Sequence, residues 1–135
     1  MYGRRSTFNF TAFVKESYLG ILLNFRQAVN DDHFHDQQFI LLSSLCRIMA
    51  MISADGTDFL DATADKMLIV LRAFTSLGVA AASAWKTYIE TLSDKALLRL
   101  LPHTLVSIEP LFQYEEGRKL LKYIFEERRL HFAAK

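Results

Sequence analysis

Large apolar residues recur every three or four positions between residues 97 and 112, which is the spacing of one buried face of an α-helix. Ser93 is a suitable N-cap for this helix. Pro102 falls inside the pattern, where it removes one backbone hydrogen bond and should kink the helix, and Pro110 should end it. The apolar face is expected to consist of Leu97, Leu98, Leu101, Leu105, Ile108 and Phe112.

The same period continues along the rest of the chain and predicts an all-α fold, because no segment shows the alternation of a strand. Polar residues or glycine separate about six helices. The expected segments are 11–29, 36–52 with Asp36 as N-cap, 57–74 with Thr57 as N-cap, 79–92 after Gly78, 93–109 and 115–130.

The apolar residues of these helices favour stacked pairs. The first helix shows an apolar stripe through Phe13, Leu19 and Leu23, which Leu22 and Phe25 widen. The second helix has two apolar rows, so it should pack on two sides. Helix pairs recurring about every forty residues are typical of HEAT-type repeats, in which antiparallel α-α hairpins form a solenoid. A closed bundle is the alternative, since no strict sequence repeat is visible. We expect a flexible arm at 1–10 and a single helical domain at 11–135.

Composition limits the class of protein. Sixteen basic and fifteen acidic side chains nearly cancel, so the chain has no global field that would draw it to nucleic acid or an anionic membrane. No uninterrupted apolar run is long enough to cross a bilayer, and the first residues lack the apolar core of a signal peptide. The single cysteine, Cys46, lies in an apolar run and suits core packing in a reducing compartment. We therefore expect an intracellular protein without membrane contact.

Two places offer groups for chemistry, and each has a plainer interpretation. Residues 31–36 contain His33, His35 and three aspartates, which are ligands for zinc, but their spacing does not place two histidines one helical turn apart. A solvated loop and helix cap is the preferred interpretation. His103 is a possible general base, yet no nucleophile stands near it in the pattern, so we expect it at a helix-helix contact. The sequence predicts no catalytic residue, cofactor or metal site.

Two further features are candidates for binding. The last helix carries basic residues that could face phosphates, although the glutamates at 115, 116, 126 and 127 dilute their charge. Direct DNA binding is therefore the alternative, and a solvated face or a contact with a neighbouring repeat is preferred. Trp85 could anchor a partner, but burial in the core is preferred. The basic interaction candidates are Arg118, Lys119, Lys122, Arg128 and Arg129.

A set of residues in a fixed order runs through the whole chain. Its members are Leu19-Gly20-Ile21-Leu22 with Phe25, Leu42, Leu45, Met49, Lys66-Met67, Leu71-Arg72, Ala84-Trp85, Leu92, Leu100-Leu101 with His103, Val106, Pro110-Leu111, Tyr123-Ile124, Glu127 and Arg129. In these residues, from 16 to 130, the sequence resembles the UME domain of the ATR-type checkpoint kinases, which are related to phosphatidylinositol 3-kinases. Residues that depart from the family are Pro102, Arg128, which stands where the family tends to carry Asn, and the loop 31–38.

This resemblance implies a non-catalytic segment of a HEAT-repeat solenoid that precedes the kinase domain of a nuclear serine/threonine kinase activated by DNA damage or replication stress. The chain lacks a Gly-rich loop and any His-Arg-Asp or Asp-Phe-Gly run, so kinase activity is not expected from it. Expected partners are adjacent helical repeats, a partner subunit or another kinase chain. Isolated from its parent, the segment should self-associate through apolar end surfaces.

Overall fold

The computed structural model describes residues 9–30 and 35–128, and this part of the chain contains six α-helices and no strand. Short 3₁₀ turns follow α3 at Thr75–Leu77 and α5 at Glu109–Gln113, and a π-helical turn, Tyr123–Glu127, continues α6. The all-α prediction is thus confirmed. The helices are α1 (Phe10–Asn30), α2 (His35–Ser53), α3 (Asp58–Ala73), α4 (Val79–Thr91), α5 (Asp94–Ile108) and α6 (Glu115–Lys122).

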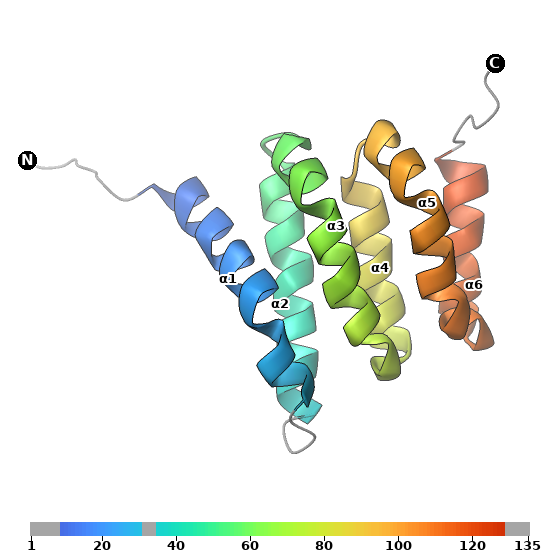
Figure 1. Cartoon of the computed structure of the whole chain (residues 1–135). Helices are drawn as coiled ribbons and strands as arrows, with labels where there is room; N and C mark the ends of the chain where they lie inside the picture. Colours follow the sequence, from blue (N-terminus) through green and yellow to red (C-terminus); the bar gives the residue numbers. More distant parts are fainter. Residues whose placement is uncertain (1–8, 31–34, 129–135) are drawn as a thin grey trace, which may run out of the picture.

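The helices form three antiparallel hairpins that stand side by side in a row (Figure 1). In this row α1, α3 and α5 make one layer, and α2, α4 and α6 make the other. Hydrogen bonds join helices of the same layer across 45 residues (Tyr18 to Thr63), 34 residues (Arg99 to Asp65) and 39 residues (Arg128 to Ile89). Each helix therefore packs on the equivalent helix of the next pair, which is the predicted helical-repeat arrangement and not a closed bundle.

The core is continuous along the row and is densest around α4. This helix buries Trp85, Tyr88 and Ile89 together with three alanines, and its neighbours in the same layer are α2 and α6. Small side chains let these neighbours approach closely, and the large rings fill the remaining space. Trp85 is fully buried and meets the Tyr88 ring edge-on at 5.4 Å. The prediction that Trp85 belongs to the core is confirmed.

The helix ends agree in part with the capping and helix-ending residues that the sequence predicts. Ser93 caps α5 by accepting a hydrogen bond from the Ala96 backbone N–H at 3.2 Å, and Pro110 lies in the 3₁₀ turn after α5 ends. Thr57 precedes α3, but its side chain makes no capping hydrogen bond. Asp36 is not the N-cap of α2, because that helix already begins at His35. Likewise α1 begins at Phe10, one residue before the expected boundary at Thr11.

The predicted apolar stripe of α1 is confirmed at Leu22 and was wrong at Phe13, Leu19 and Leu23. The helix buries Val14, Tyr18 and Leu22, whereas Phe13 and Leu23 are 54% and 74% exposed. Tyr18 decides this orientation, because its ring packs on Phe59 with centroids 5.7 Å apart and its hydroxyl lies 2.9 Å from Thr63 Oγ1. The Tyr18 ring buries a large apolar area while its hydroxyl keeps a hydrogen-bond partner on α3, so this tyrosine can lie in the core.

The last helix shows a similar departure from its predicted face. It buries Leu120 and Ile124 as expected, but Leu121 is only half-buried and Phe125 is 46% exposed. Leu120 and Ile124 are four residues apart and form the buried row, and Leu121 and Phe125 each lie one position beyond it, so the buried face is narrower than predicted.

The first turn of α6 packs directly on the preceding 3₁₀ turn, and Gly117 makes this possible. A Cβ atom at Gly117 would lie 1.9 Å from the Leu111 carbonyl oxygen and 2.4 Å from its carbon. Both atoms belong to the backbone, so they cannot move aside as the end of a side chain can. In contrast, a Cβ at Gly20 in the middle of α1 would meet no atom within 4 Å.

Gly117→Ala should therefore destabilise the domain by about 3 kcal/mol or more, because the backbone of the turn must shift. The matched variant Gly20→Ala should instead stabilise it by about 0.5–1 kcal/mol, since alanine favours an unobstructed helix interior. Urea unfolding followed by circular dichroism measures both. Equal effects of the two variants would show that the approach of α6 to Leu111 does not limit stability.

The buried tyrosine Tyr88 should make the domain sensitive to alkaline pH. Burial raises the pKa of Tyr88, chiefly because the phenolate would lose its hydration, and the hydroxyl donates to the Ala64 carbonyl at 2.9 Å. In the unfolded chain a tyrosine ionises at about pH 10. The contribution of Tyr88 to the free energy of unfolding should therefore be constant below that pH and fall above it, because only the unfolded chain releases the proton. Tyr88→Phe should show a shallower fall, and an unchanged pH slope in urea titrations would contradict this assignment.

Candidate functional site

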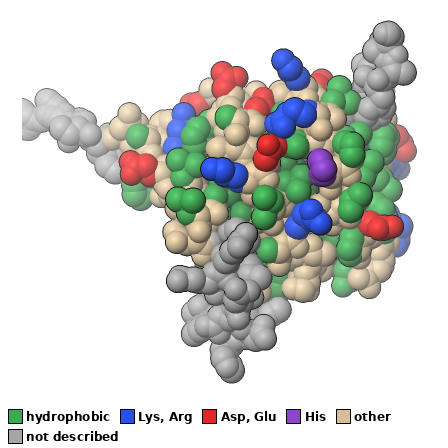
Figure 2. Space-filling view, viewed as in Figure 1, with side chains coloured by type: hydrophobic (Ala, Val, Ile, Leu, Met, Phe, Trp, Pro, Cys, Tyr) green, Lys and Arg blue, Asp and Glu red, His purple; other side chains and the backbone are tan. Residues whose placement is uncertain are grey.

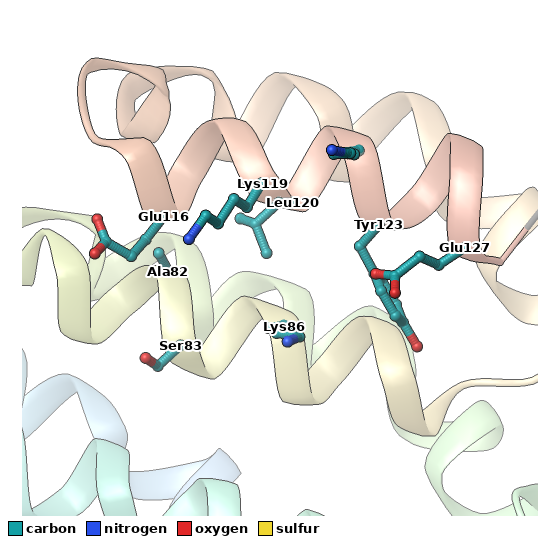
Figure 3. Close-up of a pocket in the computed structure, with 9 residues that line it drawn as sticks. Ala82, Ser83, Lys86, Glu116, Lys119, Leu120, Tyr123 and Glu127 are labelled. Carbon is teal, nitrogen blue, oxygen red and sulfur yellow. The ribbon is translucent and has the colours of Figure 1, made fainter.

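A hollow among the described residues lies between α4 and α6, and we call it the α4–α6 groove (Figure 3). Its volume is about 470 Å³. Charged side chains of both signs surround an apolar floor formed by Ala82 and Leu120. The lining residues are Ala82, Ser83 and Lys86 of α4, Glu116, Lys119, Leu120 and Lys122 of α6, and Tyr123 and Glu127 of the π-helical turn.

The π-helical turn brings Tyr123 and Glu127 to the same end of this groove (Figure 3). Lys86 Nζ lies 5.8 Å from the centre of the Tyr123 ring, within range of a cation-π contact. Partial burial raises the pKa of Tyr123, and Glu90 acts in the same direction, whereas Arg128 opposes the shift. The groove can thus present ammonium groups beside an aromatic ring, but its two glutamates leave it only a small excess of positive charge.

Arg128 anchors the end of the chain's described part to the α4–α5 junction. Its guanidinium donates to the Ile89 carbonyl, donates to the Leu92 carbonyl at 3.1 Å, and pairs with Asp94. The side chain is only 14% exposed. Carbonyls at the C-terminal end of a helix lack intrahelical partners and carry partial negative charge, so a guanidinium stabilises them. Arg128 is therefore a structural residue.

The predicted row of basic residues on the last helix does not form. Besides the anchored Arg128, Arg118 donates to the Phe112 carbonyl at 2.7 Å and Lys119 Nζ lies 3.3 Å from Glu115. Lys122 is exposed and lines the α4–α6 groove. Arg129 lies outside the described residues. Among the predicted interaction residues, Arg128 therefore has internal partners, because carbonyls at the end of α4 accept hydrogen bonds from its guanidinium.

The residues that carry the family resemblance divide between core and surface. Trp85 is in the core, whereas Glu127 is exposed at the rim of the α4–α6 groove. Lys66 and Arg72 are exposed on α3. His103 is also exposed, and it lies beside the hollow between α3 and α5. The reason is the register of α5, in which the residues around His103 that face the core are Leu100, Leu101 and Thr104.

The described residues contain neither a cluster of metal-binding side chains nor a helix that could cross a membrane. Within residues 9–30 and 35–128, no group of three or more His, Cys, Asp or Glu side chains is placed to hold a metal ion. His33 and its acidic neighbours at 31–34 lie outside this part of the chain. Burial raises the pKa of the half-buried Cys46 thiol, and a hydrogen bond with Thr87 opposes the shift. Among the described helices, none has the length and apolar content needed to cross a membrane.

Comparison with family models identifies the family. The model described as the UME (NUC010) domain matches residues 13–112, which is more than half of the chain. The chain belongs to the UME domain family. The match spans α1 to α5 and stops before α6, so the part of the UME resemblance at 123–129 lies beyond the matched residues. No curated protein and no solved structure matches the chain.

The anchoring role of Arg128 in this UME domain can be tested directly. Arg128→Ala should destabilise the domain by about 1.5–3 kcal/mol, because it leaves two half-buried carbonyls and Asp94 without their charged donor. The control Lys122→Ala removes an exposed positive charge six residues earlier in the same segment and should change stability by less than about 0.5 kcal/mol. Urea unfolding measures the difference, and two equal effects would show that Arg128 is not an anchor.

Proposed function

We propose that this UME domain is a non-catalytic scaffold and protein-interaction segment of an ATR-like serine/threonine checkpoint kinase that acts in the nucleus on DNA damage. Membership of the UME family and the stack of helix pairs support this proposal. Catalysis would belong to another part of the parent protein. The role of this segment would be to connect adjacent helical repeats and to present its side faces to a partner subunit or another kinase chain.

The observation that carries the proposal is a set of apolar side chains exposed on the first helix pair, at the N-terminal end of the row. There α1 exposes Leu19 and Leu23, and α2 exposes Ile40 and Met51; we call these four residues the end surface. A hollow of about 300 Å³ lies beside it between the start of α1 and the end of α2. An internal repeat exposes such a surface when the preceding repeat is missing, whereas a terminal repeat carries a polar cap.

Sedimentation velocity of the isolated chain tests the end surface. We expect self-association that increases with concentration, and Leu23→Glu should shift the protein to monomer because it places a charge in the apolar contact. The control Val79→Glu changes an exposed apolar residue at the start of α4 and should leave the association unchanged. A wild-type chain that stays monomeric at all concentrations would contradict the end-surface proposal. Cross-linking mass spectrometry on the full-length parent would then test which repeats and subunits the segment touches.

Nucleic-acid binding is the alternative, and one observation favours it. Lys86, Lys119 and Lys122 converge on the α4–α6 groove and could contact phosphates. Glu116 and Glu127 in the same groove oppose this. A shift of labelled duplex DNA that disappears as salt increases would support the alternative, and no shift at low salt would dispose of it.

A further inference from the structure

A second hollow lies on the opposite layer, between the neighbouring helices α3 and α5, and we call it the α3–α5 groove. Its volume is about 440 Å³. Figure 2 shows the face on which it opens, where basic side chains and a histidine stand among hydrophobic ones. It shares no residue with the α4–α6 groove or the end surface. The lining residues are Asp65, Leu68, Ile69 and Arg72 of α3 and Arg99, Leu100 and His103 of α5.

The charges in the α3–α5 groove are not balanced within the described residues. Arg99 Nη1 lies 3.1 Å from Asp65 Oδ1, so the carboxylate of the groove already has a partner. The guanidinium of Arg72 forms no hydrogen bond or ion pair with any described residue, and the ring of His103 forms none either. Farther along the same helices, Asp61 accepts a hydrogen bond from the Ser93 backbone N–H. Arg72 is therefore an uncompensated cation at the edge of the groove.

Apolar groups lie directly beside this cation. Leu68 and Leu100 form a buried floor, and Ile69 at the rim is 51% exposed. Val106, which is 65% exposed, follows His103 by three residues and so lies on the same side of α5. Exposed Ile and Val next to Arg are typical of protein-binding surfaces, where an apolar contact excludes water around a charged hydrogen bond.

The mixture of groups favours a peptide over a nucleic acid as the occupant. A phosphate backbone offers nothing apolar to cover Ile69 and Val106. An amphipathic helix with acidic residues on one side can cover them and pair with Arg72 at once. The Arg99–Asp65 pair does not prevent this, because both side chains are more than half exposed and such a pair is worth at most about 1 kcal/mol.

We infer that the α3–α5 groove is the docking site for an acidic amphipathic segment of a partner protein. A carboxylate of this segment accepts two hydrogen bonds from the planar guanidinium of Arg72, and its apolar side rests on Ile69 and Val106. His103 supplies a further polar contact at the α5 edge. The inference rests on the proposed interaction role and names the kind of partner that this layer of the stack would bind.

The test is fluorescence anisotropy at low salt with a panel of labelled peptides that carry Glu and Leu on opposite sides of a helix. We expect at least one peptide to bind, its Glu→Gln version to bind weakly, and Arg72→Gln to weaken binding by about fivefold or more. The matched control Arg47→Gln removes an equal charge from an exposed site on α2 and should change binding by less than about twofold. Arg72→Lys keeps the positive charge but lacks the planar pair of N–H donors, so it should give an intermediate loss of affinity.

Three outcomes would overturn the inference. The first is that no peptide of the panel binds at low salt, and the second is an equal loss in Arg72→Gln and Arg47→Gln, which would indicate non-specific attraction. The third is that duplex DNA binds more tightly than every peptide of the panel and that this binding depends on Arg72. None of these outcomes depends on Leu23, so failure of the groove and failure of the end-surface proposal can be told apart. Thermal unfolding of the variants checks that each loss is not a loss of fold.

Discussion

The structure depends on one packing constraint, which is that each helix pair must cover the apolar face of the next. α4 shows this most clearly, because it lies between α2 and α6 in its layer and buries side chains toward both. Its alanines are small enough for these neighbours to pack closely, and the buried rings of Trp85 and Tyr88 fill the space between the helices. The Tyr88 hydroxyl reaches the Ala64 carbonyl of α3. Shortening these rings would leave a cavity in the core, whereas enlarging the alanines would force the neighbouring helices apart.

Apolar burial alone does not fix the register of one pair against the next, since leucine faces can slide. Polar contacts supply the register. Tyr18 with Thr63 aligns α1 with α3, Asp61 with the Ser93 N–H aligns α3 with α5, and Arg128 with the Ile89 and Leu92 carbonyls aligns the α6 segment with α4. Each contact has a defined geometry and lies at a helix boundary or at the edge of the core. Together they place the grooves between helices of one layer at set positions.

Sequence reasoning succeeded where a residue's role follows from its neighbours in the chain. The number of helices, the Ser93 cap, Pro110 at the end of α5 and the burial of Trp85 were all predicted, because local spacing and capping chemistry determine them. It failed for α1, where an apolar pattern cannot distinguish leucines that pack on the core from leucines exposed at an end of the row, such as Leu23.

The candidate sites were less predictable for the same reason. Lys119 and Lys122 were identified from the basic last helix, but Lys86 was not, since its place in the groove depends on α4 packing against α6. Arg72 and His103 lie 31 residues apart, and only the stacking of α3 on α5 brings them to one groove. Arg128 was predicted as an interaction residue, but α4 ends beside it, and its guanidinium therefore binds the Ile89 carbonyl inside the molecule.

The arrangement separates three kinds of contact. The end surface lies along the direction of the row, whereas the α3–α5 and α4–α6 grooves lie in opposite layers, so each can be occupied without blocking the others. The contacts also differ in chemistry, because the end surface is apolar and the grooves combine charge with small apolar areas. Apolar contact suits a permanent junction with the next repeat, and exposed charge suits a partner that associates and leaves. A helical-repeat segment built in this way can hold its neighbours permanently while its side faces exchange partners.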